Sequence, residues 1–156
     1  MDKAKSMIWY TLVRTRISKE VKMKRLEVSA AILVYKDKIL CTQRGKGKYE
    51  YISFKYEFPG GKIETGENPK EALQRELVEE MDIIIGINDM QFFYTVNHNY
   101  PDFEITMHSF ICPMETDIFN LNEHVDFKWM GIDKLDLLDW APADLPIVME
   151  LKKKGL

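Results

Sequence analysis

Alternating hydrophobic and polar residues mark the first elements of the chain. The alternation runs through "LEVSAAILVY" (26–35) and, after a polar turn at 36–38, resumes in "ILCTQR" (39–44). A period of two is typical of strands with one buried face, so these stretches predict a hairpin. The next residues, "RGKGKYEYISFK" (44–55), have no periodicity and predict a loop with an extended second half. "YEFPGG" (56–61) then predicts a turn.

The following segment carries clear signals for the start of a helix. Asn68 is a good N-cap, and Pro69 suits the first helical position. Glu71 stands three residues after the cap, where a capping-box carboxylate reaches back to the backbone. The sequence therefore predicts a helix from Pro69 to Met81.

The second half of the chain predicts four more strands and two more helices. The strands are expected at 83–87, 90–100, 104–114 and 127–132, and the helices at 133–140 and 142–155. Strands before and after one central helix, with helices at the end, predict an α/β (α+β) protein in which a mixed sheet is covered on both faces.

Composition fits one globular domain. The 156 residues are 46% hydrophobic and 30% charged, values that exclude a disordered or fibrous protein. The net charge is only −3, yet residues 1–25 carry eight Lys or Arg against two acids. A basic segment can meet nucleic acid or an anionic surface. A solvated extension is the simpler interpretation, so no nucleic-acid partner is expected.

Cysteine and hydrophobic content indicate a reducing compartment. Cys41 and Cys112 both lie in apolar alternating stretches, which suits buried free thiols better than a disulfide. The apolar run at residues 7–13 is too short to span a bilayer and no small-residue cleavage site follows it. We therefore expect a cytoplasmic protein with no membrane contact.

The predicted helix has an acidic face beside an apolar one. At 100° per residue, three carboxylates share an arc of about 100°, those of Glu76, Glu79 and Glu80. The adjoining apolar stripe consists of Leu73, Leu77, Val78 and Met81. An ordinary solvated acidic face is one interpretation. The nearby Gly-Gly turn, Glu67 and Arg75 favour another, a platform for a hard cation such as Mg²⁺ that binds a diphosphate.

These residues resemble a known motif. Gly61, Glu67 and the run "RELVEEMDI" (75–83) match the pattern G-x5-E-x7-R-E-U-x-E-E-x-G-U of the Nudix box, with U apolar. Asp82 stands where the family has Gly. Because Asp tolerates the left-handed conformation that ends a helix, we expect the chemistry to be intact.

The resemblance to the MutT-type branch of the Nudix family covers roughly residues 25–151. "YEFPGGKIE", "NEHVDFKWM" and "WAPADLPIV" resemble segments of that branch, and most of all those of bacterial CTP pyrophosphohydrolases and oxidised-dNTP diphosphatases. The resemblance implies a Nudix-type α/β/α sandwich with a mixed central β-sheet over residues 23–156. Residues 1–22 would be a basic N-terminal extension or an upstream start.

The resemblance also implies an activity, the hydrolysis of a (d)NTP or modified nucleotide to the monophosphate and pyrophosphate in nucleotide pool sanitation. The cofactor would be Mg²⁺, with Mn²⁺ as a substitute. The metal ligands would be the carbonyl of Gly60 and the carboxylates of Glu76, Glu79, Glu80 and Glu123. Arg75 would orient the glutamates, and Glu67 would act as an outer ligand or orienter. Either Glu79 or Glu123 would be the general base.

Four residues are candidates for binding the nucleotide. The family pattern places Arg44 near the nucleotide, and Phe58 would offer an apolar or stacking surface. Trp140 would stack on the base or else belong to the core. Asp144 would accept a hydrogen bond from an exocyclic amine such as cytosine N4, with capping of the last helix as its alternative or additional role.

Other residues narrow the choice of function. Phe103 replaces an Arg that oxidised-guanine enzymes can carry in this turn, which favours a cytidine-type or broader substrate range. His98, His108 and His124 are expected to be structural or exposed. Two alternatives remain, a Nudix hydrolase of another nucleoside diphosphate derivative such as ADP-ribose and a non-catalytic nucleotide-binding module. The second is disfavoured because all four box glutamates are present. A monomer or homodimer is expected.

Overall fold

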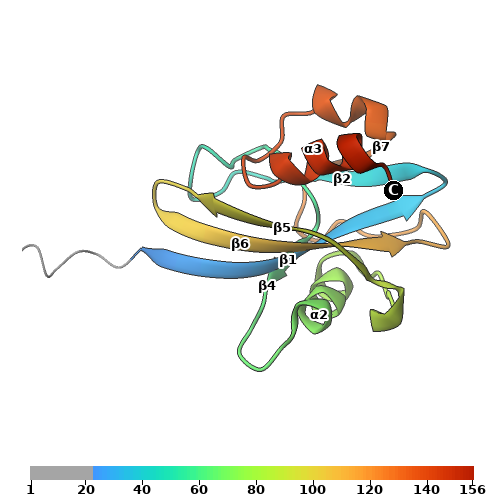
Figure 1. The fold of residues 1–156 in the computed structure, drawn as a ribbon, viewed down its shortest axis with the longest axis horizontal. Helices are drawn as coiled ribbons and strands as arrows, with labels where there is room; N and C mark the ends of the chain where they lie inside the picture. The colour runs from blue at the N-terminus through green and yellow to red at the C-terminus, as the bar shows by residue number, and fades with distance from the viewer. Residues whose placement is uncertain (1–22) are drawn as a thin grey trace, which may run out of the picture.

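One mixed sheet forms the centre of the molecule in the computed structural model, which describes residues 23–156 (Figure 1). The expected extension at residues 1–22 lies outside the described residues. The strands are β1 (Lys24–Tyr35), β2 (Lys38–Gln43), β3 (Tyr56–Glu57), β4 (Gly60–Lys62), β5 (Gln91–Asn99), β6 (Phe103–Pro113) and β7 (Asp126–Met130). The helices are α2 (Pro69–Met81) and α3 (Leu145–Lys154), with 3₁₀ turns η1 (Ile87–Asp89) and η2 (Ile132–Leu137).

The strand order opens a space between β1 and β2. The sheet runs β3-β2-β1-β6-β5, and β1 pairs with β6 in parallel along almost its whole length. The β1–β2 hairpin is paired at its closed end, Val34 with Ile39 and Tyr35 with Lys38. Farther along, β1 pairs with β4 and β2 pairs with β3 and β7. The two strands therefore separate, and the segment between β2 and β4 occupies the space.

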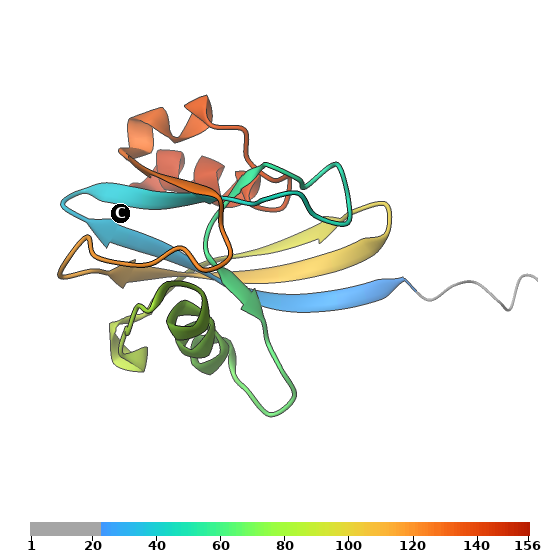
Figure 2. The same cartoon turned by 180° about the vertical axis from the view of Figure 1, so that it is seen from behind.

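Two helices cover opposite faces of the sheet (Figures 1 and 2). Successive residues of β1 point to opposite faces, so the strand contributes to two separate cores. The core on the α2 side includes Ala31, Leu33, Leu73 and Leu77. The core on the α3 side includes Ala30, Ile32, Ile147 and Leu151. The expected α+β sandwich with a mixed sheet is confirmed.

The start of α2 is capped as predicted. Glu71 N donates to Asn68 Oδ1 over 3.0 Å, and Asn68 N donates to Glu71 Oε2 over 3.1 Å. The other end shows how Asp82 replaces glycine. Asp82 adopts the left-handed conformation, with φ 55° and ψ 33°. Its carboxylate accepts a hydrogen bond of 2.7 Å from Asn120 Nδ2.

The strand predicted at 83–87 is wrong. Ile83 and Ile85 are buried while Ile84 is 83% exposed, which reproduces the alternation of a strand. This alternation arises because the chain packs alternate isoleucines under the end of α2. Within residues 23–156 the segment has no strand partner, and η1 follows it.

Smaller differences concern loops and helix ends. Residues 44–55 form turns rather than an extended second half, and residues 56–61 contain β3 and the start of β4. The last helix begins at Leu145 instead of residue 142, and the helix expected at 133–140 is the 3₁₀ turn η2. Val78 is exposed, so it does not belong to the apolar stripe of α2.

Two further sequence predictions concern the state of the cysteines and contact with a membrane. Cys41 and Cys112 are buried free thiols, as predicted, and burial raises the pKa of each to about 12. No helix in residues 23–156 has the length and apolar character needed to cross a bilayer. The cytoplasmic location stays a prediction.

Candidate active site

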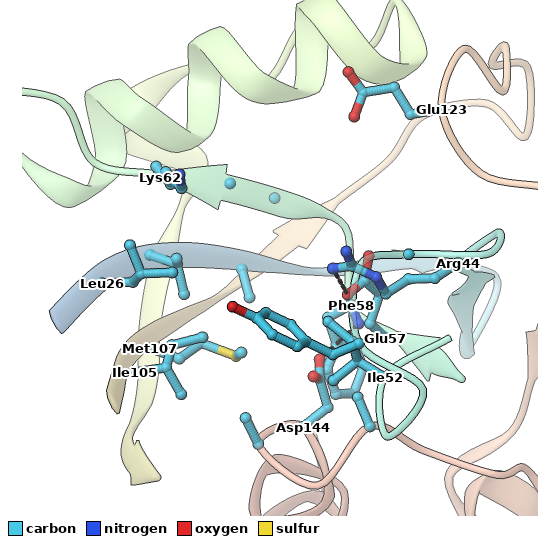
Figure 3. Close-up of a pocket in the computed structure, with 18 of the residues that line it drawn as sticks. Leu26, Arg44, Ile52, Glu57, Phe58, Lys62, Ile105, Met107, Glu123 and Asp144 are labelled. Atoms are coloured by element: carbon cyan, nitrogen blue, oxygen red, sulfur yellow. Dashed lines mark hydrogen bonds and ion pairs between the residues drawn. The ribbon is translucent and has the colours of Figure 1, made fainter. Parts of the chain in front are cut away.

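A cavity of about 750 Å³ lies where β1 and β2 separate (Figure 3). One end is acidic and lies beside α2, where Glu76, Glu79, Glu80 and Glu123 line it. The opposite end lies beside the start of α3, where Asp144 lines it. The cavity therefore joins the acidic face predicted from the helix to residues that the sequence places far away. We call these the acidic end and the Asp144 end.

Two glycines bring β4 against both β1 and α2. A Cβ on Gly60 would lie 1.9 Å from the carbonyl oxygen of Ser29 in β1. A Cβ on Gly61 would lie 2.3 Å from Cδ of Glu76. A side chain at Gly60 would clash with the backbone of β1, and one at Gly61 would displace the carboxylate of Glu76, so the backbone of this turn approaches that carboxylate directly.

Arg75 connects three of the box glutamates. Its Nε and Nη2 each donate to one oxygen of Glu67 over 2.8 Å, a bidentate pair. Its Nη1 donates to Glu76 over 2.9 Å and to Glu79 over 3.3 Å, and Nη2 also donates to the carbonyl of Lys62 over 3.0 Å. The hydrogen bonds from Arg75 lower the pKa of Glu67 to about 2, and those carboxylates raise the pKa of Arg75.

Glu80 is the buried acid of the site. It is 6% exposed, and its Oε2 has no hydrogen-bond partner among the described residues. Burial, with the nearby charges of Glu123 and Glu76, raises its pKa to about 9. A buried oxygen without a partner is unfavourable unless a ligand or water completes its bonding.

The loop before β7 places Glu123 beside Glu80. Asn120 N donates to the carbonyl of Met81 and Asn122 N to that of Glu80, each over 3.0 Å. Asn122 Nδ2 also donates to the carbonyl of Glu79 over 3.0 Å. The loop thus satisfies carbonyls that the last turn of a helix leaves unpaired. Sequence reasoning missed these two asparagines, although Asn122 stands directly before Glu123 and Asn120 lies two positions before that.

At the Asp144 end, Asp144 is 2% exposed and Phe58 N donates to its Oδ1 over 2.9 Å. Burial raises the pKa of Asp144 well above its usual range, and the charge of Glu57 adds to this. Asp144 also occupies the N-cap position of α3, without a side-chain capping bond. Phe58 lines the cavity.

Trp140 lies behind Phe58 rather than on the cavity. The two rings stack with centroids 4.7 Å apart, and Trp140 Nε1 donates to the carbonyl of Leu135 over 2.7 Å. Trp140 is buried in the core on the α3 side. This placement corresponds to the core alternative for Trp140, so any contribution to base binding passes through Phe58.

Arg44 lines the cavity between its two ends. It contacts Glu57, which in turn contacts His124, and sequence reasoning gave neither of these two residues a role in the site. Its Nη1 donates to Oε2 of Glu57 over 3.2 Å. The other oxygen of Glu57 lies 3.1 Å from Nε2 of His124. The side chain of His124 is only 5% exposed, and both Glu57 and His124 line the cavity. In the "YEF" run, Glu57 stands between the aromatic residues Tyr56 and Phe58. This alternation was the signal in the sequence that could have marked Glu57 as a candidate site residue.

Comparison with known proteins identifies the family. The sequence pattern of the NUDIX domain matches residues 23–151, most of the chain. The chain belongs to the Nudix family. The resemblance that the box indicated is thereby confirmed.

Similar Nudix proteins cover nearly the same length. An 8-oxo-dGTP diphosphatase of Escherichia coli is 32% identical over 134 residues, 84% of this chain and 99% of the relative. A CTP pyrophosphohydrolase of the same organism is 31% identical over 128 residues, 81% of this chain and 90% of the relative. The crystal structure of a MutT protein from Methanosarcina mazei superposes with a TM-score of 0.72 at 20% identity, covering 88% of this chain and all of that one.

The acidic end of this Nudix chain fits a divalent ion. Glu80 offers a buried oxygen without a partner among the described residues, and the carboxylate of Glu76 packs directly against the bare backbone of Gly61. Within residues 23–156, however, no group of three or more His, Cys, Asp or Glu side chains is arranged so that these side chains alone could hold a metal ion. Mg²⁺ in proteins usually keeps several waters and takes other ligands from substrate phosphates.

Proposed function

We propose that this Nudix protein hydrolyses a nucleoside triphosphate to the monophosphate and pyrophosphate in a reaction that requires Mg²⁺. The observation that carries the proposal is a single cavity with carboxylates for a metal and phosphates at one end and a buried acid for a base at the other. The named activities of the two Escherichia coli relatives support the same reaction class.

The acidic end supplies the metal ligands and the proton acceptor. Gly60, Glu76, Glu79, Glu80 and Glu123 are the proposed ligands. A divalent ion bound there would neutralise phosphate charge and make a coordinated water more acidic. Water adds to phosphorus, the phosphoanhydride bond between the α and β phosphates breaks, and the water's proton passes to Glu79 or Glu123. Arg75 holds Glu67, Glu76 and Glu79 in fixed orientations throughout.

The Asp144 end is suited to a base with an exocyclic amine. Glu57 can accept a hydrogen bond from that amine while it is ionised, and protonated Asp144 can donate one to a ring nitrogen or carbonyl. The raised pKa of Asp144 favours this division between the two acids. Phe58 supplies the apolar surface beside them, and Arg44 orients Glu57. The turn at Phe103 contributes aromatic surface, because its ring packs on Tyr49 and Tyr100.

The substrate range we propose includes cytidine triphosphates and modified purines. CTP, dCTP, 5-methyl-dCTP, 8-oxo-dGTP and 2-hydroxy-dATP all carry an exocyclic amine. The test compares pyrophosphate release from each at one fixed concentration, with and without Mg²⁺. UTP and ADP-ribose serve as comparison compounds, and the nucleotide products are separated by chromatography.

We expect Mg²⁺-dependent release of pyrophosphate from at least one amine-bearing triphosphate and much slower release from UTP. Hydrolysis of ADP-ribose alone would replace the proposal by a different Nudix activity. Binding of nucleotide with no product from any compound would identify a non-catalytic module.

A further inference from the structure

The residues that precede and follow His124 in the sequence are both anchored to other elements of the fold. Asn122 bonds to the end of α2, and Val125 N donates to the carbonyl of Gln43 in β2 over 3.0 Å. Between these anchors, Glu123 faces the acidic end of the cavity, and the next side chain, His124, reaches Glu57. Two successive residues therefore contact two different parts of one cavity, Glu123 its acidic end and His124 the glutamate that lies between the two ends.

Glu57 depends on two neighbours for its hydrogen bonds. Arg44 donates to Oε2 over 3.2 Å, and Nε2 of His124 lies 3.1 Å from Oε1. The acids around Glu57 are Asp144 on one side and Glu80 on the other, and the charge of Glu57 affects both. A carboxylate among other acids is unfavourable unless donors hold it. Each oxygen of Glu57 has one such donor.

The contact between Glu57 and His124 assigns the role of the imidazole. Because an ionised carboxylate only accepts hydrogen bonds, we assign the proton of this pair to Nε2 of His124. Nδ1 of His124 is buried and has no partner among the described residues. The single polar contact of this ring with another described side chain is thus the one with Glu57.

We propose that His124 is a positioning residue that holds Glu57 toward the base, so that the loop carrying Glu123 also sets the selectivity for an exocyclic amine. This inference rests on the proposed function. Its consequence is that one short segment, residues 122–124, ties the position of a metal ligand to the position of a base-reading acid. His124 acts through Glu57 and makes no contact with the reacting atoms.

The test uses the full chain with His124→Leu, His124→Gln, Glu57→Ala and the double variant Glu57→Ala with His124→Leu. Leucine removes the donor, while the amide of glutamine still reaches Glu57. For each protein, kcat and KM are measured with the best amine-bearing triphosphate and with UTP. Selectivity is the ratio of the two kcat/KM values.

His124→Leu is expected to lower selectivity about tenfold, a typical effect of losing one hydrogen bond to a charged group. The change falls mainly on KM for the amine-bearing nucleotide, and kcat stays within about threefold. His124→Gln restores most of the selectivity. In the Glu57→Ala background, which has no side-chain acceptor at this position, His124→Leu has little further effect, because the pair is already broken.

A purely structural histidine would behave differently. Its loss would lower selectivity equally with or without Glu57, or glutamine would be as harmful as leucine, and either result overturns the proposal. Thermal unfolding shows whether each variant folds. If the leucine variant does not fold, His124→Asn replaces it, because the shorter amide does not reach Glu57.

A second measurement does not depend on hydrolysis. Nitrogen-15 NMR of the ring in the nucleotide-free protein at pH 8 reports which nitrogen of His124 carries the proton. We expect the proton on Nε2, and a neutral ring protonated on Nδ1 overturns the inference. If no nucleotide is hydrolysed by the unaltered protein, the proposed function fails and this spectrum still decides the contact. If hydrolysis is normal and selectivity is unchanged in His124→Leu, only the positioning role fails.

Discussion

Replacing Arg75 by methionine tests whether the guanidinium organises the acidic end. The change removes two hydrogen bonds to Glu67 and one each to Glu76, Glu79 and the carbonyl of Lys62. Hydrogen bonds to charged groups contribute about 1.5–3 kcal/mol each, but bonds that share one side chain do not add. The side chain of Arg75 is 26% exposed, which lowers the effect further through solvent screening. We therefore expect a net loss of about 2–3 kcal/mol in the free energy of unfolding.

That loss corresponds to a decrease of about 6–9 °C in Tm for a domain of this size, measured by circular dichroism in EDTA. Misplaced glutamates should also lower kcat/KM for pyrophosphate release about 10–100-fold, the usual effect of removing a residue that orients metal ligands. Arg75→Lys keeps the charge but loses the bidentate geometry, so its Tm and its kcat/KM should lie between those of the unaltered protein and those of Arg75→Met.

Arg25→Met is the matched control. Arg25 makes one ion pair, 2.7 Å from Glu104, and its side chain is 83% exposed. Its loss should change the free energy of unfolding by at most about 0.5 kcal/mol and leave activity unchanged. If Arg75→Met and Arg25→Met have equal Tm values and both hydrolyse within threefold of the unaltered protein, the organising role of Arg75 is refuted.

Three further predictions concern other parts of the site. Glu79→Gln should lower kcat by about 10²–10⁴-fold with little change in Tm. Glu115→Gln, the same change at a distant exposed acid, should leave kcat and Tm unaltered. Equal activities of the two variants would show that Glu79 takes no part in the reaction. In Asp144→Asn the amide oxygen still accepts from the backbone, and the cost of ionising a buried acid is removed. Because the folded-state pKa of Asp144 is raised, the unaltered protein loses stability as pH rises above 3.8, the ordinary pKa of an Asp side chain. Urea unfolding at neutral pH should therefore show that the asparagine variant is more stable, and a less stable variant contradicts this. The pyrophosphate-release assay should show that the same variant is less active. Gly61→Ala should displace Glu76, since the new Cβ would lie 2.3 Å from its Cδ, and the Mg²⁺ concentration for half-maximal activity should rise at least tenfold; an unchanged Mg²⁺ titration would show that Glu76 tolerates the methyl group.

Local rules were sufficient for the helix and its ends. The capping box at Asn68 and Glu71 and the left-handed residue Asp82 depend on neighbours within a few positions, so the sequence predicted them correctly. The strand expected at 83–87 failed for the opposite reason. Alternating burial of isoleucines has the same pattern whether they face a sheet or the underside of a helix, and only a hydrogen-bonded partner makes a strand.

The Asp144 end shows the limit of sequence reasoning in this protein. Asp144 was a candidate because of a family pattern, but its raised pKa comes from burial and from Glu57, 87 positions earlier. His124 was expected to be structural or exposed, and it lies against that same glutamate. Neither contact follows from spacing, because the residues come from separate segments of the chain.

The sequence by itself determined the acidic face of α2, its capped start and the bare glycines that precede it, since each follows from the helical period or from backbone sterics over a few residues. The tertiary structure decided where the cavity opens and which acids meet in it. The physical reason is that β1 leaves β2 to pair with β4 and β6, and such long-range pairing depends on the packing of both cores rather than on any local pattern.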